Sequence, residues 1–257
     1  ILDEKIRGKR VVYLGEEDHW IHEKYRYRCL LLQYLFSHGW RYIGEELGWS
    51  DGLRIDRYLA TGERASLERI ATYGYCGDAR EDREAQVSGI LKDALDNYPL
   101  AAFKAGQIRF AGFLRSFNDI HFTRSDRLRF FGFDVNAQPG GGYQDINELL
   151  EPVPGSAKLT DILTLLNAVP GETLEQEIYR LEQLLVVIRE KESTLKRELG
   201  ERRFMQLYQW VITIKESLDY YRLANHARDY KTLNKALALR DKMMFRHVDF
   251  VLSQMKP

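Results

Sequence analysis

The chain has 257 residues, which suffices for one α/β domain with a subsidiary element but not for several independent domains. Hydrophobic residues make up 44% and charged residues 30%, as in an ordinary globular protein. Lysine plus arginine and aspartate plus glutamate both number 38, so the net charge is zero and the basic excess of a nucleic-acid-binding protein is missing. No apolar run approaches the ~20 residues of a membrane-spanning helix, and residues 1–5 lack a signal-peptide pattern. We therefore expect a cytoplasmic protein without a nucleic-acid or membrane partner.

The first elements of the chain predict a strand–helix–strand unit. Residues 10–15 are a β-branched run that ends in glycine, which predicts a buried strand. A helix is expected at about 22–37, with Gly39 as its stop. A second strand is expected at 41–46 and ends in Glu46. This order implies parallel strands joined by a right-handed crossover.

Further helical patterns and a third strand follow. Helices are expected at about 51–60, 65–72, 84–97 and 100–118. The strand expected at 128–134 ends in Asp134 and leads into a proline- and glycine-rich loop.

The later part of the chain predicts long helices. Residues 173–199 predict a charge-rich amphipathic helix, with Thr173 and Gln176 as a capping box and a glycine as its stop. A second helix at 201–224 completes an antiparallel hairpin. A last helix is expected at about 232–254.

These elements divide the chain into three expected parts. Residues 1–154 form an α/β catalytic core, residues 155–230 a helical hairpin insertion, and residues 231–257 a helix that returns to the core. The expected fold class is therefore α/β: a parallel-sheet core flanked by helices, with an inserted long α-helical hairpin, and helix-rich overall.

Side chains capable of chemistry follow the expected strands. Glu16 and His19 come after the first strand, Glu46 ends the second, and Asp134 ends the third. Open parallel sheets bind ligands beyond the carboxyl ends of their strands. Three carboxylates and an imidazole are therefore expected to converge on one crevice.

His19 is the candidate base of this crevice. The pKa of an unperturbed imidazole lies near neutrality, so His19 can accept a proton from water. Glu16 can hold the ring in one tautomer, although a solvated or structural pair is the simpler alternative. Glu46 follows an apolar strand and either acts as an acid or caps the next helix. Glu45 should face away from Glu46, because strand side chains alternate.

Three further polar residues have open assignments. Arg115 and Asn118 lie three apart on one helix face and are candidates for the site, with plain surface exposure as the alternative. Periodicity does not fix whether Arg28 faces the crevice or solvent.

Several motifs are absent from the sequence. It has no Gly-x-Ser-x-Gly for a serine nucleophile and no Gly-x-Gly-x-x-Gly for a dinucleotide. Water activated by His19 is then the simplest chemistry, and neither a cofactor nor a metal is expected. A metal remains the alternative, because His19 and His22 lie three apart with Glu23 adjacent, although this spacing does not match His-Glu-x-x-His.

The segment from Leu14 to Glu23 carries a family resemblance. Its residues Gly15-Glu16-Glu17-Asp18-His19-Trp20-Ile21-His22-Glu23 resemble the Gly-Glu-x-x-His-Gly-x-x-Glu signature of the erythromycin esterase family. Further pieces that resemble the family follow in its order: Arg28, Glu46-Leu47-Gly48-Trp49, Tyr58 with Gly62, Arg115-Ser116-Phe117-Asn118, Gly132-Phe133-Asp134 and Arg240-Asp241-Lys242-Met243-Met244. The resemblance extends from about residue 10 to residue 250.

The resemblance implies metal-free hydrolysis, typically of a macrolide lactone ester and thus linked to macrolide resistance, by a water that a histidine activates. Carried over to this chain, His19 is the base or its partner, and Glu16 and Glu46 orient the histidine and the water. Arg28 stabilises developing negative charge. The residues expected to bind substrate are Glu23, Trp49, Arg115, Asn118 and Asp134.

Two departures from the family pattern bear on the site. Trp20 stands where the family usually has glycine, so a bulky indole is expected beside the base. Family members also continue past the Arg-Asp helix into a strand that ends in Trp-x-His-Asn-x-His. The family core is therefore expected to extend beyond residue 257.

The leading hypothesis is a carboxylic ester hydrolase of the erythromycin esterase type that acts on a small-molecule ester or lactone. One alternative is a metal-dependent hydrolase that uses His19, His22 and a carboxylate. The other is a non-catalytic ligand-binding module of the same fold. The sequence leaves the oligomeric state and the exact substrate open.

Overall fold

A computed structural model describes residues 2–15, 24–68, 70, 100–123, 126–135, 141–151, 159–167, 169 and 171–254. Within these residues the elements are α1 (Leu2–Ile6), α2 (Lys24–Ser37), β1 (Tyr42–Gly48), α3 (Trp49–Thr61), α4 (Ala65–Glu68), α7 (Leu100–His121), β2 (Arg129–Asp134), α8 (Gly141–Leu150), α9 (Thr160–Leu166), α10 (Leu174–Glu190), α11 (Glu192–Leu199), α12 (Glu201–Asn225) and α13 (Tyr230–Gln254). The expected helix at 84–97 lies outside the described residues.

The two described strands pair in parallel, as the sequence predicts for 41–46 and 128–134. Tyr42 lies opposite Arg129, and the regular register continues to Glu45 opposite Gly132. An irregularity then brings Gly48 opposite Asp134. Because the strands are parallel, their carboxyl ends meet at one edge.

The strand expected at 10–15 is not formed. Residues 11–15 have no regular structure, and the side chains of Val11, Tyr13 and Leu14 are exposed. A β-branched run becomes a strand only where a neighbouring strand pairs with it. Val12 packs against the core on the side of α2, but no described strand pairs with this segment. The described sheet therefore consists of β1 and β2.

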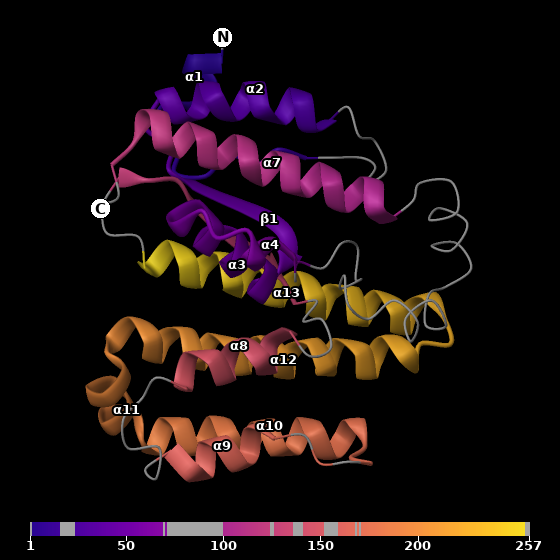
Figure 1. The fold of residues 1–257 in the computed structure, drawn as a ribbon. Coiled ribbons are helices and arrows are strands. Elements are labelled where there is room, and N and C mark those ends of the chain that lie inside the picture. The colour runs from indigo at the N-terminus through magenta and orange to yellow at the C-terminus, as the bar shows by residue number, and fades with distance from the viewer. Residues whose placement is uncertain are drawn as a thin grey trace.

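Helices cover both sides of this small sheet (Figure 1). One apolar core lies on the side of α2 and α7, and its most buried members include Leu59, Leu114, Leu128 and Phe130. A second core gathers side chains of α8 to α13 around Trp49 and includes Ile146, Leu181, Leu184, Ile188, Leu195 and Leu207. The helical hairpin thus shares a core with the first residue of α3 at the end of β1.

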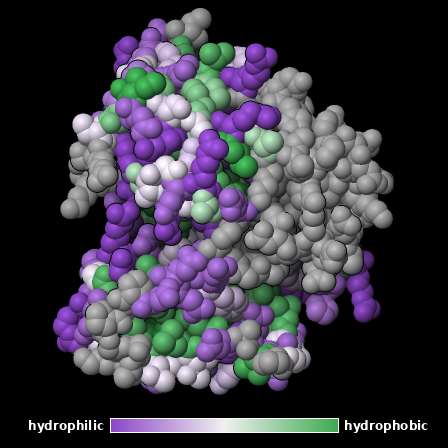
Figure 2. All heavy atoms as spheres, in the orientation of Figure 1, coloured by the Kyte–Doolittle hydropathy of each residue, from purple (hydrophilic) through white to green (hydrophobic). Residues whose placement is uncertain are grey.

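On the face in Figure 2, hydrophilic residues cover most of the described surface, and the larger apolar patches lie over the lower layer of helices.

The helical part differs in one respect from its prediction. The single helix expected at 173–199 is divided at Lys191 into α10 and α11, whereas the capping box is confirmed. The backbone amide of Gln176 donates to Thr173 Oγ1 at 3.3 Å, and the backbone amide of Thr173 donates to the side-chain Oε1 of Gln176 at 2.8 Å. Gly200, with φ +81°, separates α11 from α12 as the expected stop.

Two glycines let α3 lie directly on β2. A Cβ atom on Gly52 would lie 1.8 Å from the amide nitrogen of Gly132, and one on Gly132 would lie 2.1 Å from the carbonyl oxygen of Gly48. A side chain on Gly52 would push the helix off β2, and one on Gly132 would displace the last residues of β1, which lead into α3. The close approach brings the start of α3 to the carboxyl end of the sheet.

No described helix combines the length and the apolar composition that a bilayer crossing requires.

Candidate functional site

Three charged side chains meet at the carboxyl end of the sheet. Arg240 of α13 donates from Nε to Asp134 Oδ1 at 2.9 Å and from Nη2 to Asp134 Oδ2 at 2.8 Å. The same Nη2 donates to Glu46 Oε1 at 2.5 Å. Asp134 ends β2, and Glu46 lies near the end of β1. We call Glu46, Asp134 and Arg240 the strand-end cluster.

The strand-end cluster keeps its arginine charged. Burial works against the charge of Arg240, but the hydrogen bonds and charges of Asp134, and then those of Glu46, outweigh it and raise the pKa of the guanidinium. One cation faces two carboxylates, so the cluster has a net negative charge when both acids are ionised.

The two carboxylates differ in their access to solvent. The side chain of Asp134 is 6% exposed, whereas that of Glu46 is 39% exposed. Asp134 has both oxygens bound by Arg240, while Glu46 uses only Oε1 for that contact. Glu46 is therefore the member that water or a ligand can reach.

Glu45 and Glu46 lie on opposite sides of β1, as the alternation predicts. Arg28 of α2 forms a short ion pair with Glu45 and lies 5.8 Å from the ring centre of Phe110 on α7. Arg240 contacts Glu46 from α13 on the other side (Figure 1). The structure does not bring Arg28 to Glu46, because Glu45 holds the arginine on the far side of the strand.

Trp49 is placed next to the strand-end cluster but is part of the second core. It is 3% exposed, and its ring centre lies 6.0 Å from that of His247 and 5.7 Å from that of Phe250. Its indole Nε1 has no hydrogen-bond partner among the described residues. Trp49 therefore packs beneath the site instead of lining an open pocket.

Arg115 and Asn118 lie near the opposite end of the sheet. Arg115 donates from Nη1 to the Leu59 carbonyl at 2.7 Å, near the end of α3. Asn118 Oδ1 accepts from the Leu128 amide at 2.7 Å, just before β2 begins. Six residues of strand, or about 20 Å, separate Leu128 from Asp134. The structure does not bring Arg115 and Asn118 to the strand-end cluster, because Arg115 binds the end of α3 and Asn118 binds the segment before β2.

The remaining expected site residues, Glu16, His19 and Glu23, lie outside the described residues. The histidine pair of the metal alternative, His19 and His22, lies outside them as well. Among the residues that the structure describes, no group of three or more histidine, cysteine, aspartate or glutamate side chains is arranged to hold a metal.

Arg240 is the residue of the strand-end cluster that the site prediction missed. It lies three residues before Met243 and seven before His247, both buried, so the three positions share one face of α13. A charged residue in register with buried positions signals a paired cation. The sequence alone does not name its partners, which are 106 and 194 residues away.

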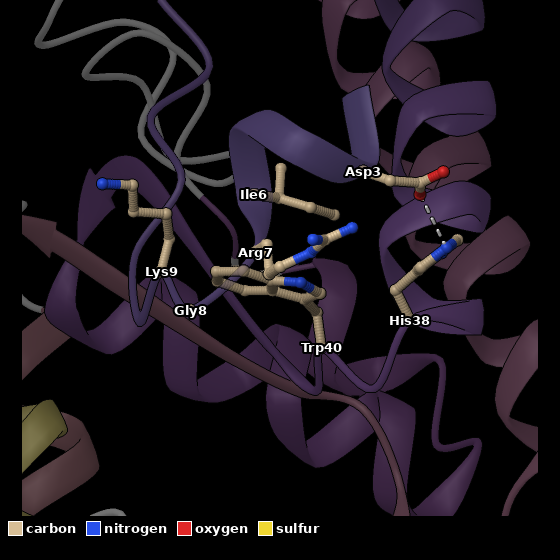
Figure 3. Close-up of a pocket in the computed structure, with 7 residues that line it drawn as sticks. All are labelled: Asp3, Ile6, Arg7, Gly8, Lys9, His38 and Trp40. Atoms are coloured by element: carbon tan, nitrogen blue, oxygen red, sulfur yellow. Dashed lines mark ion pairs between the residues drawn. The ribbon is translucent and has the colours of Figure 1, made fainter. Parts of the chain in front are cut away.

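A hollow of about 490 Å³ lies elsewhere, between α1 and the turn that follows α2 (Figure 3). Arg7, Lys9 and Trp40 line it, and across it Asp3 pairs with His38 at 3.1 Å. Trp40 precedes β1, so this hollow is at the amino end of the strand and is separate from the strand-end cluster.

Three solved structures share the fold of this chain and are distant from it in sequence. A protein from Bacillus cereus matches with 17% identity and a TM-score of 0.61, over 90% of this chain and 52% of that one. A mutant of the erythromycin esterase EreC in its open conformation matches with 20% identity and a TM-score of 0.59, over 98% and 60%. A succinoglycan biosynthesis protein matches with 12% identity and a TM-score of 0.55, over 88% and 49%. The chain thus spans about half to three fifths of the length of these proteins.

No curated protein matches the chain. A family model does: the model described as erythromycin esterase matches residues 36–257. The matched segment contains all three members of the strand-end cluster. The helix-rich fold with its parallel strand pair agrees with this match, and the chain belongs to the erythromycin esterase family.

Proposed function

We propose that the chain is a hydrolase of this family that cleaves a carboxylic ester or lactone of a small molecule with water activated by His19. The strand-end cluster is the observation that carries the proposal. It puts a reachable carboxylate, Glu46, beside a permanently charged arginine at the carboxyl end of parallel strands, where α/β proteins bind ligands.

Each residue has a part in the proposed reaction. His19 takes a proton from water as the water oxygen attacks the carbonyl carbon, and Glu16 orients the imidazole. Glu46 Oε1 is held by Arg240, which leaves Oε2 to accept a hydrogen bond from the attacking water. The tetrahedral intermediate collapses when the alkoxide leaves and takes the proton from His19. Macrolide lactones are one candidate class of substrate.

Arg28 has a narrower place in this proposal. An arginine near the carbonyl would stabilise the negative charge of the intermediate. Arg28 pairs with Glu45, so it reaches a bound ester only from the α2 side of β1. Arg240 is the cation on the Glu46 side, where it fixes the carboxylate.

A substrate screen tests the proposal. The full chain is incubated with aryl esters, aliphatic lactones and macrolides in isotope-labelled water, and the products are analysed by mass spectrometry. We expect the product acid to contain one labelled oxygen, and we expect His19→Asn to abolish turnover while His22→Asn, the matched control three residues away, retains it. Full activity of the His19→Asn protein, or no turnover of any ester by the full chain, would contradict the proposal.

A further inference from the structure

A second histidine lies behind the strand-end cluster in the interior of the protein. His247 of α13 is 0% exposed, and α13 packs along β2. Its Nδ1 lies 3.1 Å from the carbonyl oxygen of Phe133, the residue before Asp134. A carbonyl oxygen only accepts hydrogen bonds, so Nδ1 carries the proton in this contact.

The other side of the ring is held by two residues of α12. Nε2 of His247 lies 3.3 Å from Thr213 Oγ1 and 3.3 Å from Glu216 Oε2. The Thr213 hydroxyl donates to the Gln209 carbonyl at 2.8 Å, so Oγ1 is an acceptor toward the ring. Both ring nitrogens therefore face acceptors, and the ring cannot turn over without losing the Phe133 contact.

Glu216 adds a charge to this arrangement. It is 4% exposed, and Arg246 forms an ion pair with its Oε1. Its Oε2 is close enough to His247 for an ion pair, but no described group lies in line to give it a hydrogen bond. Glu216 therefore closes the Nε2 side of the ring, and Arg246 provides the counter-charge of its carboxylate.

We propose that His247 is a positioning residue of the strand-end cluster: through the Phe133 carbonyl it fixes the end of β2, and thereby the Asp134 carboxylate that aligns Arg240 with Glu46. Phe133 and Asp134 are adjacent, so a shift of the Phe133 peptide moves the Asp134 side chain. Arg240 holds Asp134 with two hydrogen bonds and Glu46 with one, so the displacement reaches the exposed carboxylate.

Two substitutions separate the hydrogen bond from the volume of the ring. His247→Asn retains an amide nitrogen at the place of Nδ1, whereas His247→Leu fills similar space without a donor. On an ester that the full chain hydrolyses, we expect His247→Leu to lower kcat about tenfold with little change in KM, and His247→Asn to stay within about threefold of the natural protein. If the leucine variant does not fold, His247→Gln replaces it, because its amide nitrogen matches Nε2 and not Nδ1. Equal losses in the donor and non-donor variants would overturn the proposal.

A second background tests whether the effect passes through Asp134. In an Asp134→Asn protein the link to Arg240 is already weakened, so the further loss caused by His247→Leu should fall to about twofold or less. An undiminished tenfold loss in that background would show that His247 acts by another route and would overturn the proposal.

The activity readout rests on the proposed function, so a readout without substrate accompanies it. Nuclear magnetic resonance of the full chain measures hydrogen exchange at the Nε–H of Arg240 and of Arg54. We expect His247→Leu to speed exchange at Arg240 about tenfold and to leave Arg54, which is paired with Asp145 between α3 and α8, unchanged. Equal acceleration at both arginines would mean general loosening and would overturn the proposal. A protein that hydrolyses no ester but shows the selective change at Arg240 would refute the proposed function and support this one.

Discussion

Arg240 and Asp134 are 106 residues apart in the sequence and are joined by two parallel hydrogen bonds of 2.9 and 2.8 Å. The pair connects the last described helix to the end of β2, and Asp134 is almost completely buried. The planar guanidinium matches the two carboxylate oxygens, a geometry that a lysine ammonium cannot reproduce. The relationship couples stability to the shape of the site, because the same guanidinium also binds Glu46.

Removal of this cation should destabilise the fold. Arg240→Met leaves Asp134 buried without a partner, and we expect the free energy of unfolding to fall by about 3 kcal/mol. Arg240→Lys keeps the positive charge but not the planar guanidinium that binds both carboxylate oxygens, so its free energy of unfolding should fall by less. Urea unfolding followed by circular dichroism measures both values, with Arg189→Met as the control, because Arg189 is exposed and its guanidinium contacts the Tyr208 hydroxyl and ring. An Arg240→Met protein as stable as this control would show that Arg240 does not stabilise the buried Asp134 carboxylate.

Loss of the exposed carboxylate should act on turnover and not on stability. Glu46→Gln keeps the size of the side chain and an acceptor for Arg240 but removes the charge that orients water. We expect kcat/KM to fall on the order of 10²-fold, with an unfolding midpoint close to that of the natural protein, since Glu46 is the more exposed partner of Arg240. Glu175→Gln, in the exposed first turn of α10, is the matched control. Unchanged hydrolysis by the Glu46→Gln protein would remove Glu46 from the mechanism.

Local sequence signals predicted the local structure well. The strands at 41–46 and 128–134 and the Thr173 capping box are each marked by a pattern of neighbouring residues in the sequence, and all three are present. The run at 10–15 has the composition of a strand but no neighbour to pair with in the described sheet, so its prediction was wrong. Strand formation depends on a partner that the segment itself does not encode.

Side-chain orientation was harder to predict. The helix expected at 22–37 is present from Lys24 to Ser37, and Leu35 of its apolar residues is buried as expected, whereas Tyr27 and Leu30 are 75% and 66% exposed. Apolar residues occur all around this helix, so periodicity does not select the buried face. Periodicity therefore did not place Arg28 either. Its partner Glu45 lies on β1, which α2 contacts only in the folded protein.

The close packing of α3 on β2 makes Gly52 irreplaceable by even the smallest side chain. A Cβ atom there would lie 1.8 Å from a backbone nitrogen, which cannot move aside as a side chain can. We expect Gly52→Ala to lower the free energy of unfolding by about 3 kcal/mol or more. Gly112→Ala on α7 is the control, because a Cβ atom there meets nothing within 4 Å and alanine stabilises a helix interior by up to about 1 kcal/mol. Thermal unfolding of both variants checks the prediction, and equal midpoints would show that α3 does not rest on the strand as described.

The stability of the protein should depend on pH in the acidic range through Asp56, which joins α3 to β2. Asp56 accepts hydrogen bonds from Arg127, Arg129 and the Phe130 amide. Burial opposes its ionisation, but the two arginines outweigh burial and hold the pKa of the carboxyl below its ordinary value of 3.8. A carboxyl whose pKa is lower in the folded state stabilises the fold above the unfolded value and loses that contribution as the pH falls through the folded value.

The matching experiment compares the natural protein with Asp56→Asn. At neutral pH the natural protein should be the more stable, because the asparagine leaves two partly buried arginines without their counter-charge. As the pH falls below about 3.8, the difference in unfolding free energy should shrink, since the natural carboxyl is then protonated in the unfolded chain and progressively in the folded one. Urea unfolding at several pH values measures it, with Asp126→Asn as the control for an exposed ion pair to Arg41. A difference that stays constant through this acidic range would mean that the charge of Asp56 does not hold α3 to the sheet.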